Sequence, residues 1–270
     1  VSYLTYAYHF TNDKKYARKA MEHIKMWFID KNTRMNPHLN FAQVIRGHNK
    51  DNGRSEGIID TYGFINMVQC FELLSESSAM SQREYQELKK WFLNFLNWLL
   101  TSELGKQCAQ AKNNHAVAYD VQVVAYALFT ENENIAKEVI ANFPKKRLHK
   151  QINSDGSQPY ELNRTLALHY SIFNLDHILD FCTLAQKIDI DLYSKEESIE
   201  KAIAYLSQFI GKEKQDFPYK QINDWDKSQS ALCWLIQRST LFQMNNQYNS
   251  LFKTYCKTPY SDIKWLIYTL

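Results

Sequence analysis

The 270-residue sequence has little of the two residues that most often turn a chain. It contains 7 Gly and 5 Pro, a scarcity that disfavours all-β folds, in which the chain must turn every few residues. Hydrophobic residues make up 45% and charged residues 23%, which is ordinary for a folded globular protein. The composition therefore favours a helical chain, long enough for one large domain or two small ones.

Missing patterns exclude several kinds of partner and cofactor. No apolar run approaches the ~20 residues that cross a bilayer, and no signal peptide is recognisable. The net charge is only +3, and Lys and Arg form no block of the kind that binds nucleic acid. No metal-ligand spacing, P-loop, GxGxxG or GxSxG occurs. We therefore expect no metal, no cofactor, no nucleic acid and no membrane span, while the oligomeric state is left open.

The cysteines form no recognisable framework. The count is odd, the spacings are wide and no CxxC pair is present among Cys70, Cys108, Cys182, Cys233 and Cys256. Four of the five fall in helical patterns, where a free thiol behaves as a small buried apolar group. We expect neither a disulfide framework nor a zinc site.

Apolar residues recur every three or four positions along most of the chain, which predicts helices. Ser81 and Glu84 have the spacing of a capping box, Gly105 is a candidate helix end, and Pro144 is expected to end a helix. The expected helices are 1–10, 14–30, 55–77, one opening at the capping box, 115–129, 133–142, 145–151, 160–186, 195–210, 227–243 and 247–256.

A weak internal repeat indicates how these helices are arranged. The sequence Phe-Thr-Asn-Asp at 10–13 returns as Phe-Thr-Glu-Asn at 129–132, which predicts stacked antiparallel helical hairpins. Two irregular segments, 31–54 and 211–226, interrupt the pattern, and long loops of this kind are often functional. Aromatic residues reach 14%, which fits either a groove that stacks on sugars or the packing of large helices.

Two short segments of the sequence contain most of the candidate catalytic residues. Asn113-Asn114-His115 stands at a predicted helix start, where an Asn is usually a cap. The second run, 155–170, contains Arg164 and Tyr170, which are six residues apart. On a regular helix they would point about 240° apart, so they converge only if Arg164 lies at or before the first turn.

Four blocks occurring together resemble the alginate lyase superfamily of α/α-toroid polysaccharide lyases. They are FAQVIRGHNKDNGRSEGIIDT (41–61), NNH (113–115), DGSQPYELNRTLALHYSIFNL (155–175) and NDWDKSQSALCWL (223–235). The resemblance implies an all-α, incomplete toroid of antiparallel helical hairpins. Residues 1–270 would form one lyase domain whose first hairpins lie before Val1, and the enzyme would be periplasmic or secreted.

The resemblance also implies a mechanism, β-elimination in a uronic-acid polymer such as alginate. Asn114 and His115 match the residues that neutralise the uronate carboxylate, which makes the C5 proton more acidic. Tyr170 matches the phenol that removes this proton and protonates the O4 leaving group, and Arg164 matches the guanidinium that favours the ionised phenol. One residue serving both steps requires syn elimination. This fits β-linked mannuronate or glucuronate, but not guluronate unless His115 is a second base.

The substrate and its binding residues are less closely defined. Arg164 lies one residue nearer to Tyr170 than in the mannuronate lyases of the group, which leaves the polymer open, with glucuronan as an alternative. A non-catalytic binder of acidic oligosaccharides and a glycoside hydrolase using Glu161 or Asp226 are the other readings. Substrate-binding residues are expected to be Gln43, Arg46, His48, Arg54, Asn113, His169 and Trp225.

Overall fold

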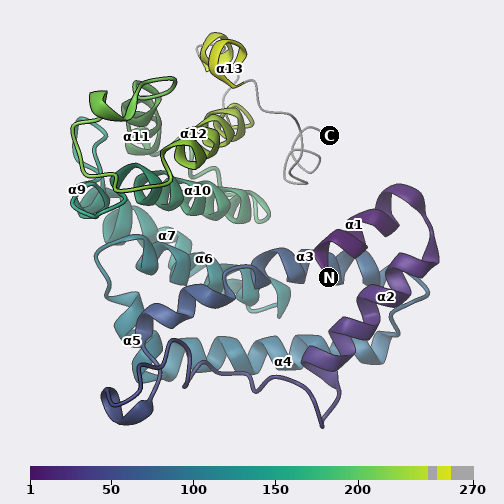
Figure 1. Cartoon of the computed structure of the whole chain (residues 1–270). Helices are drawn as coiled ribbons and strands as arrows, with labels where there is room; N and C mark the ends of the chain where they lie inside the picture. Colours follow the sequence, from purple (N-terminus) through teal and green to yellow (C-terminus); the bar gives the residue numbers. More distant parts are fainter. Residues whose placement is uncertain (243–247, 257–270) are drawn as a thin grey trace. The chain divides into compact units, whose positions relative to one another are not determined.

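The computed structural model describes residues 1–242 and 248–256, and in this part of the chain the regular structure is helical (Figure 1). One isolated β-bridge, between Leu166 and Gln221, is present there. The prediction of an all-α chain is therefore confirmed. Contacts divide the chain into a first unit, Val1–Gln110 with Gln122–Val139, and a second unit, Ala111–Val121 with Ile140–Leu270. The prediction of a single domain stays a prediction.

The first unit consists of helical hairpins joined by a long loop. Helix α2 continues into a π-helical turn, and the segment expected as a helix over 55–77 is a 3₁₀ segment followed by a helix. Its elements are α1 (Ser2–Thr11), α2 (Lys14–Ile24), η1 (Lys25–Ile29), η2 (Asn49–Asp51), η3 (Ser55–Thr61), α3 (Phe64–Ser75), α4 (Gln82–Thr101) and α5 (Glu103–Ala109). Helices α6 (Asn114–Phe129) and α7 (Glu133–Phe143) belong to both units.

The two copies of the internal repeat are the turns of two helical hairpins. Asn12 connects α1 to α2 with a φ of 54°, and Glu131 connects α6 to α7 with a φ of 62°. Both residues are left-handed, a conformation that commonly ends a helix, and they occupy the same position of the repeat. The repeat thus marks equivalent helix ends, as the hairpin prediction requires.

Local helix signals were only partly reliable. The capping box is confirmed, because the Ser81 side chain accepts from the Glu84 backbone N–H and the Glu84 carboxylate accepts from the Ser81 N–H. The expectation for Gly105 is wrong, since Gly105 lies inside α5 and α4 already ends at Thr101. Ser102 caps α5 by accepting from the Gly105 N–H at 3.0 Å, so a new helix begins where the previous one stops.

Aromatic residues form much of the core of the first unit. The Phe28 ring lies 5.8 Å from that of Phe71 and 4.9 Å from that of Trp91, and Phe92 lies 5.2 Å from Tyr126. All five side chains are buried, and edge-on or tilted aromatic pairs add stability beyond the area they bury. In this unit the high aromatic content thus serves helix packing.

The second unit contains the remaining helices. Helix α7 ends at Phe143, directly before Pro144, as expected, and the chain continues in a π-helical turn of which Pro144 is the first residue. The elements after α7 are η4 (Pro144–Leu148), α8 (His149–Gln151), α9 (Pro159–Leu162), α10 (Ala167–Gln186), α11 (Glu197–Ser207), η5 (Lys214–Asp216), α12 (Trp225–Ser239) and α13 (Asn249–Tyr255).

The helix expected over 160–186 is broken into α9 and α10, and the cause is a tertiary contact. Residues 165–167 pair with the loop before α12: the Ala167 N–H donates to the Lys220 carbonyl and the Ile222 N–H donates to the Thr165 carbonyl, each at 3.0 Å. The Gln221 side chain accepts from the Leu168 N–H, also at 3.0 Å. These bonds replace intrahelical ones and leave 163–166 outside the helix.

A turn at 155–157 leads the chain into α9. The Asp155 carboxylate accepts from the Ser157 N–H at 2.9 Å and from its hydroxyl at 2.7 Å. These bonds lower the pKa of Asp155. Gly156 has a φ of +88°, and a Cβ there would overlap the Lys201 carbonyl on α11. Only glycine fits a position with both restrictions.

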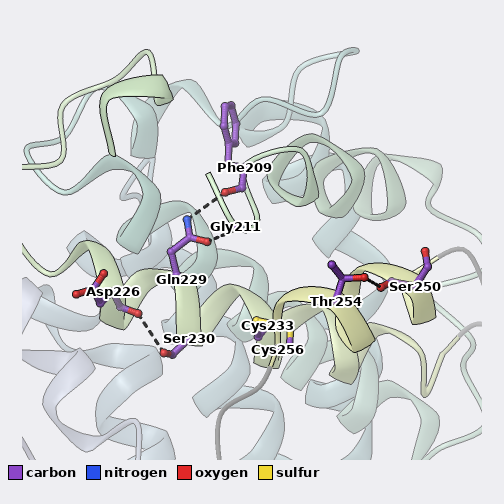
Figure 2. Close-up of a disulfide and its surroundings, with 9 residues drawn as sticks. All are labelled: Phe209, Gly211, Asp226, Gln229, Ser230, Cys233, Ser250, Thr254 and Cys256. Carbon is purple, nitrogen blue, oxygen red and sulfur yellow. Dashed lines mark hydrogen bonds between the residues drawn. A yellow bond between two sulfur atoms is a disulfide. The ribbon is translucent and has the colours of Figure 1, made fainter. Parts of the chain in front are cut away.

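A disulfide joins Cys233 on α12 to Cys256, the residue after α13 (Figure 2). The cysteine prediction is therefore wrong for this pair, although Cys70, Cys108 and Cys182 are buried and form no disulfide. The two cysteines are 23 residues apart, a separation that carries no local signal.

The surroundings of the disulfide are held by side-chain bonds to the backbone. Gln229 on α12 accepts from the Gly211 N–H at 2.9 Å and donates to the Phe209 carbonyl at 3.0 Å (Figure 2). Tyr255 lies against Gly211, where a Cβ would overlap its ring. The end of α13 is thus fixed both by the covalent bond and by packing on the loop after α11.

Replacing both Cys233 and Cys256 with Ser is expected to lower the free energy of unfolding by about 3 kcal/mol, because the crosslink closes a loop of moderate length in the unfolded chain. Urea unfolding of the oxidised protein and of the variant measures this difference. A reductant should destabilise the wild type and leave the variant unchanged. Equal unfolding of the wild type with and without reductant would contradict the prediction.

Candidate active site

The run Asn113-Asn114-His115 lies at the start of α6. Asn113 precedes the helix and its side-chain oxygen accepts from the His115 N–H at 3.3 Å, as a cap residue does. Asn114 is the first residue of the helix and is fully buried, whereas His115 is half-buried. The cap thus fixes the backbone from which the Asn114 and His115 side chains extend.

Glu161 on α9 binds Asn114 through both carboxylate oxygens. Its Oε1 accepts from the Asn114 backbone N–H at 2.6 Å, and its Oε2 accepts from the Asn114 side-chain Nδ2 at 2.9 Å. Burial raises the pKa of the Glu161 carboxyl, while the bonds from Asn114 and the charge of Arg164 act in the opposite direction. Because both oxygens accept hydrogens, the geometry is that of an ionised carboxylate.

Arg164 and Tyr170 converge because of the break between α9 and α10. Arg164 lies in the segment before Ala167, the first residue of α10, and Tyr170 lies in the first turn of that helix. The Arg164 guanidinium carbon is 3.4 Å from the centroid of the Tyr170 ring. A cation over the face of a ring is attracted to it. The condition for convergence is therefore met, and a cation lies beside the phenol.

Arg164 also connects this pair to Glu161. Its Nη1 lies 3.8 Å from Glu161 Oε2, which is within ion-pair range. Asn114, Glu161, Arg164 and Tyr170 thus form a continuous chain of contacts in the second unit. The prediction that Asn114, His115, Arg164 and Tyr170 face one groove stays a prediction, as do their catalytic roles.

Buried amide side chains form a hydrogen-bond network next to the start of α6 and to α10. Asn174 on α10 donates to the side-chain oxygens of Gln158 and Gln151 at 2.8 and 3.2 Å. Gln151 donates to the Asn113 carbonyl at 3.4 Å, and Gln158 donates to the Ser171 carbonyl at 3.0 Å. This network, which the sequence analysis missed, links the residue before α6 to α10. Isolated Gln and Asn residues give no signal for it.

His169 and Trp225 lie near the start of α10 and the start of α12. The His169 ring is 5.2 Å from that of Tyr170. The pKa of His169 is lowered, mainly by burial and also by the charge of Arg164, while the negative charge of Asp224 acts in the opposite direction. Trp225 is half-buried with its ring 5.7 Å from that of Phe217. This contact fits a helix-start anchor, and a sugar-binding role for either residue stays a prediction.

The other predicted binding residues belong to the first unit. Gln43, Arg46 and His48 are exposed in the loop before η3, and Gln43 donates to Asp60 at 2.8 Å. Arg54 lines a cavity of about 670 Å³ and lies 3.3 Å from Glu56. The cavity walls come from the loop and from the start of α5: Asn40, Phe41, Asn49, Asn52, Gly53, Arg54, Ser55, Glu56, Ser102, Glu103, Leu104 and Gln107.

This cavity has the composition of a sugar-binding surface. Amide and hydroxyl side chains predominate, together with one cation, the two carboxylates of Glu56 and Glu103, and Phe41, which is exposed. Such groups bind sugar hydroxyls and stack on sugar faces. A functional role for the loop stays a prediction, and the contribution of α5 to the cavity was missed because nothing local connects 102–107 to 40–56.

Comparisons with known proteins agree with this geometry. The profile of the Alginate lyase family matches residues 1–217. A crystal structure of an alginate lyase from Bacteroides ovatus matches with a TM-score of 0.96 and 42% identity, over 100% of this chain and 72% of that chain. No curated protein matches. The predicted toroid class of the all-α fold agrees with this neighbour. The chain therefore belongs to the alginate lyase family and is a polysaccharide lyase.

Proposed function

We propose that this lyase cleaves a polymer of β-linked mannuronate or glucuronate by syn β-elimination and leaves unsaturated uronate ends. The observation that carries the proposal is the Arg164 guanidinium, 3.4 Å from the centroid of the half-exposed Tyr170 ring. A phenol acts as a base near neutral pH only when positive charge favours its ionised form. The contact supplies that charge in a unit that also contains Asn114 and His115.

The reaction requires three changes at the substrate. Asn114 and His115 hold the carboxylate at C5, so that the negative charge that develops there is stabilised. The Tyr170 phenolate takes the C5 proton, the electron pair of the C5–H bond forms the C4=C5 double bond, and the C4–O4 bond breaks. The proton on Tyr170 then passes to O4 of the leaving sugar. The same residue acts twice, which requires the proton and O4 on one face.

Each unit contains residues to which we assign polymer binding. In the second unit these are Asn113, His169 and Trp225, and in the first unit they are Gln43, Arg46, His48 and Arg54. The polar cavity beside Arg54 supports the assignment in the first unit. The substrate is an anionic polysaccharide or oligosaccharide.

The competing readings are less well supported. Family membership favours an enzyme over a non-catalytic binder of acidic oligosaccharides. A glycoside hydrolase needs an accessible carboxylic acid, but Glu161 is only 1% exposed and both its oxygens bind Asn114. Asp226 on α12 is exposed, so accessibility does not argue against it, and it is family membership that disfavours this alternative.

We assign the protein to the periplasm or the exterior of the cell. The Cys233–Cys256 disulfide supports this location, because disulfides persist in oxidising compartments and are rare in the cytosol. In the described residues no helix is long and apolar enough to cross a membrane. Labelling of free thiols in protein taken directly from its native compartment would test the assignment, since a cytosolic protein would have both cysteines reduced.

A panel of three polymers tests the proposed reaction. Polymannuronate, polyguluronate and glucuronan are each incubated with the protein, and new C4=C5 double bonds are followed by ultraviolet absorbance. We expect a rise with polymannuronate or glucuronan that exceeds the rise with polyguluronate, since only the first two present the C5 proton and O4 on the same face. Fastest cleavage of polyguluronate would contradict the syn assignment, and no absorbance with any polymer would overturn the proposed function.

A further inference from the structure

Glu161 takes no part in the proton transfers described above, yet it occupies the centre of the site. It lies on α9 and is 1% exposed. A buried carboxylate carries a large desolvation cost unless it is paired and hydrogen-bonded. Its two partners are both residues of the proposed machinery, Asn114 and Arg164.

We infer that Glu161 is a positioning residue, which orients the Asn114 amide and holds the Arg164 guanidinium over Tyr170. The inference rests on the proposed function and deepens it. The buried Glu161 carboxylate would align Asn114, which holds the substrate carboxylate, with Arg164, which favours the ionised phenol.

The first half of the inference follows from the hydrogen-bond pattern at Asn114. An ionised carboxylate only accepts, so the end of the amide that faces Glu161 must be the nitrogen. The amide oxygen Oδ1 then points away, and it is buried with no hydrogen-bond partner among the described residues. One N–H of Nδ2 is engaged by Glu161. Without the carboxylate, the amide could turn over and exchange its donor for its acceptor.

The second half follows from the placement of Arg164. Within the described part of the chain, its buried Nη1 has no hydrogen-bond partner, and the ion pair with Glu161 is the salt bridge found for it there. The guanidinium therefore lies between a carboxylate on one side and the Tyr170 ring on the other. The negative charge of Glu161 balances the positive charge of Arg164. It also holds the guanidinium in place next to the Tyr170 ring.

A purely structural role for Glu161 predicts a different outcome from a positioning role. If Glu161 only stabilises the fold, a variant that folds should turn over substrate normally below its melting temperature. If it positions Asn114 and Arg164, turnover should fall even in a fully folded variant. Misplacement of a catalytic group by about 1 Å can reduce the rate about 10²-fold.

The test replaces Glu161 with Gln and uses Asp120→Asn as a matched control. Asp120 on α6 is also a buried carboxylate with two bonds, from Arg147 Nε at 2.7 Å and Nη2 at 3.1 Å. We expect Glu161→Gln to lower kcat and kcat/KM together by about 10²-fold with KM nearly unchanged, the signature of a lost transition-state interaction. Asp120→Asn should lower the melting temperature and keep kcat.

A second variant covers the case in which Glu161→Gln does not fold. Glu161→Asp keeps the charge but is one methylene shorter, so it cannot reach both nitrogens of Asn114, and kcat should again fall with KM retained. Normal kcat in either folded variant overturns the inference. If neither variant folds while Asp120→Asn does, Glu161 is structural and the inference is also overturned. A wild type inactive on all three polymers would instead defeat the proposed function itself.

Discussion

Tyr170→Phe is expected to reduce the formation of unsaturated ends by about 10³-fold or more. The variant lacks only the phenol oxygen, which in the proposed reaction both removes the C5 proton and protonates O4, and general acid–base catalysis contributes about 10²–10⁴-fold. Folding should be retained, because the ring contacts with Arg164 and His169 do not involve the oxygen. Initial rates by ultraviolet absorbance, on the polymer that the wild type cleaves fastest, measure the effect.

Tyr160→Phe is the matched control for this substitution. Tyr160 is a neighbouring tyrosine on α9 and is 41% exposed, so removing its oxygen should change neither the rate nor the melting temperature. A Tyr170→Phe enzyme that keeps more than about a tenth of wild-type activity would show that another group carries the proton transfers, against the usual size of such effects. In that case His115 would be the next residue to test.

Arg164→Met is expected to reduce kcat by about 10²-fold near neutral pH. Met fills much of the volume over the Tyr170 ring but carries no charge, and removing one electrostatic contact to a developing charge costs about 10²–10³-fold. The guanidinium lies 3.4 Å from the centroid of the ring, so its loss removes a positive charge next to the group that transfers the proton.

Arg164→Lys separates charge from shape at the same position. A lysine keeps the positive charge but lacks the planar group that stacks on a ring, so its activity should lie between that of Arg164→Met and the wild type. Values of kcat and KM for the three proteins measure both effects. An Arg164→Met enzyme with a raised KM and an unchanged kcat would show that Arg164 acts only in binding.

Local chemistry in the sequence was sufficient for most of the helices. The capping box of Ser81 and Glu84 and the hairpin turns at Asn12 and Glu131 depend on residues within a few positions of one another. Helical hydrogen bonds join residues four apart, so periodicity and capping residues indicate where they form. The same reasoning predicted that Asn113 or Asn114 caps the helix that begins there.

The break that brings Arg164 to Tyr170 was decided by tertiary structure. Residues 160–186 have the periodicity of one helix, but 165–167 bond to 220–222 across a separation of more than 50 residues. Helix propensity is weak compared with such contacts. The sequence analysis could state the condition for convergence but had no means of showing that it was met.

The sequence by itself determined the residue types of the site and the helical class of the fold. Asn114, His115, Arg164 and Tyr170 were chosen from their motifs, because their chemistry suits a uronate. Only the tertiary structure decided their connection through Glu161, which is 47 residues from Asn114, and the pairing of Cys233 with Cys256. The physical reason is that a contact between distant residues depends on how whole helices pack, and no local pattern records it.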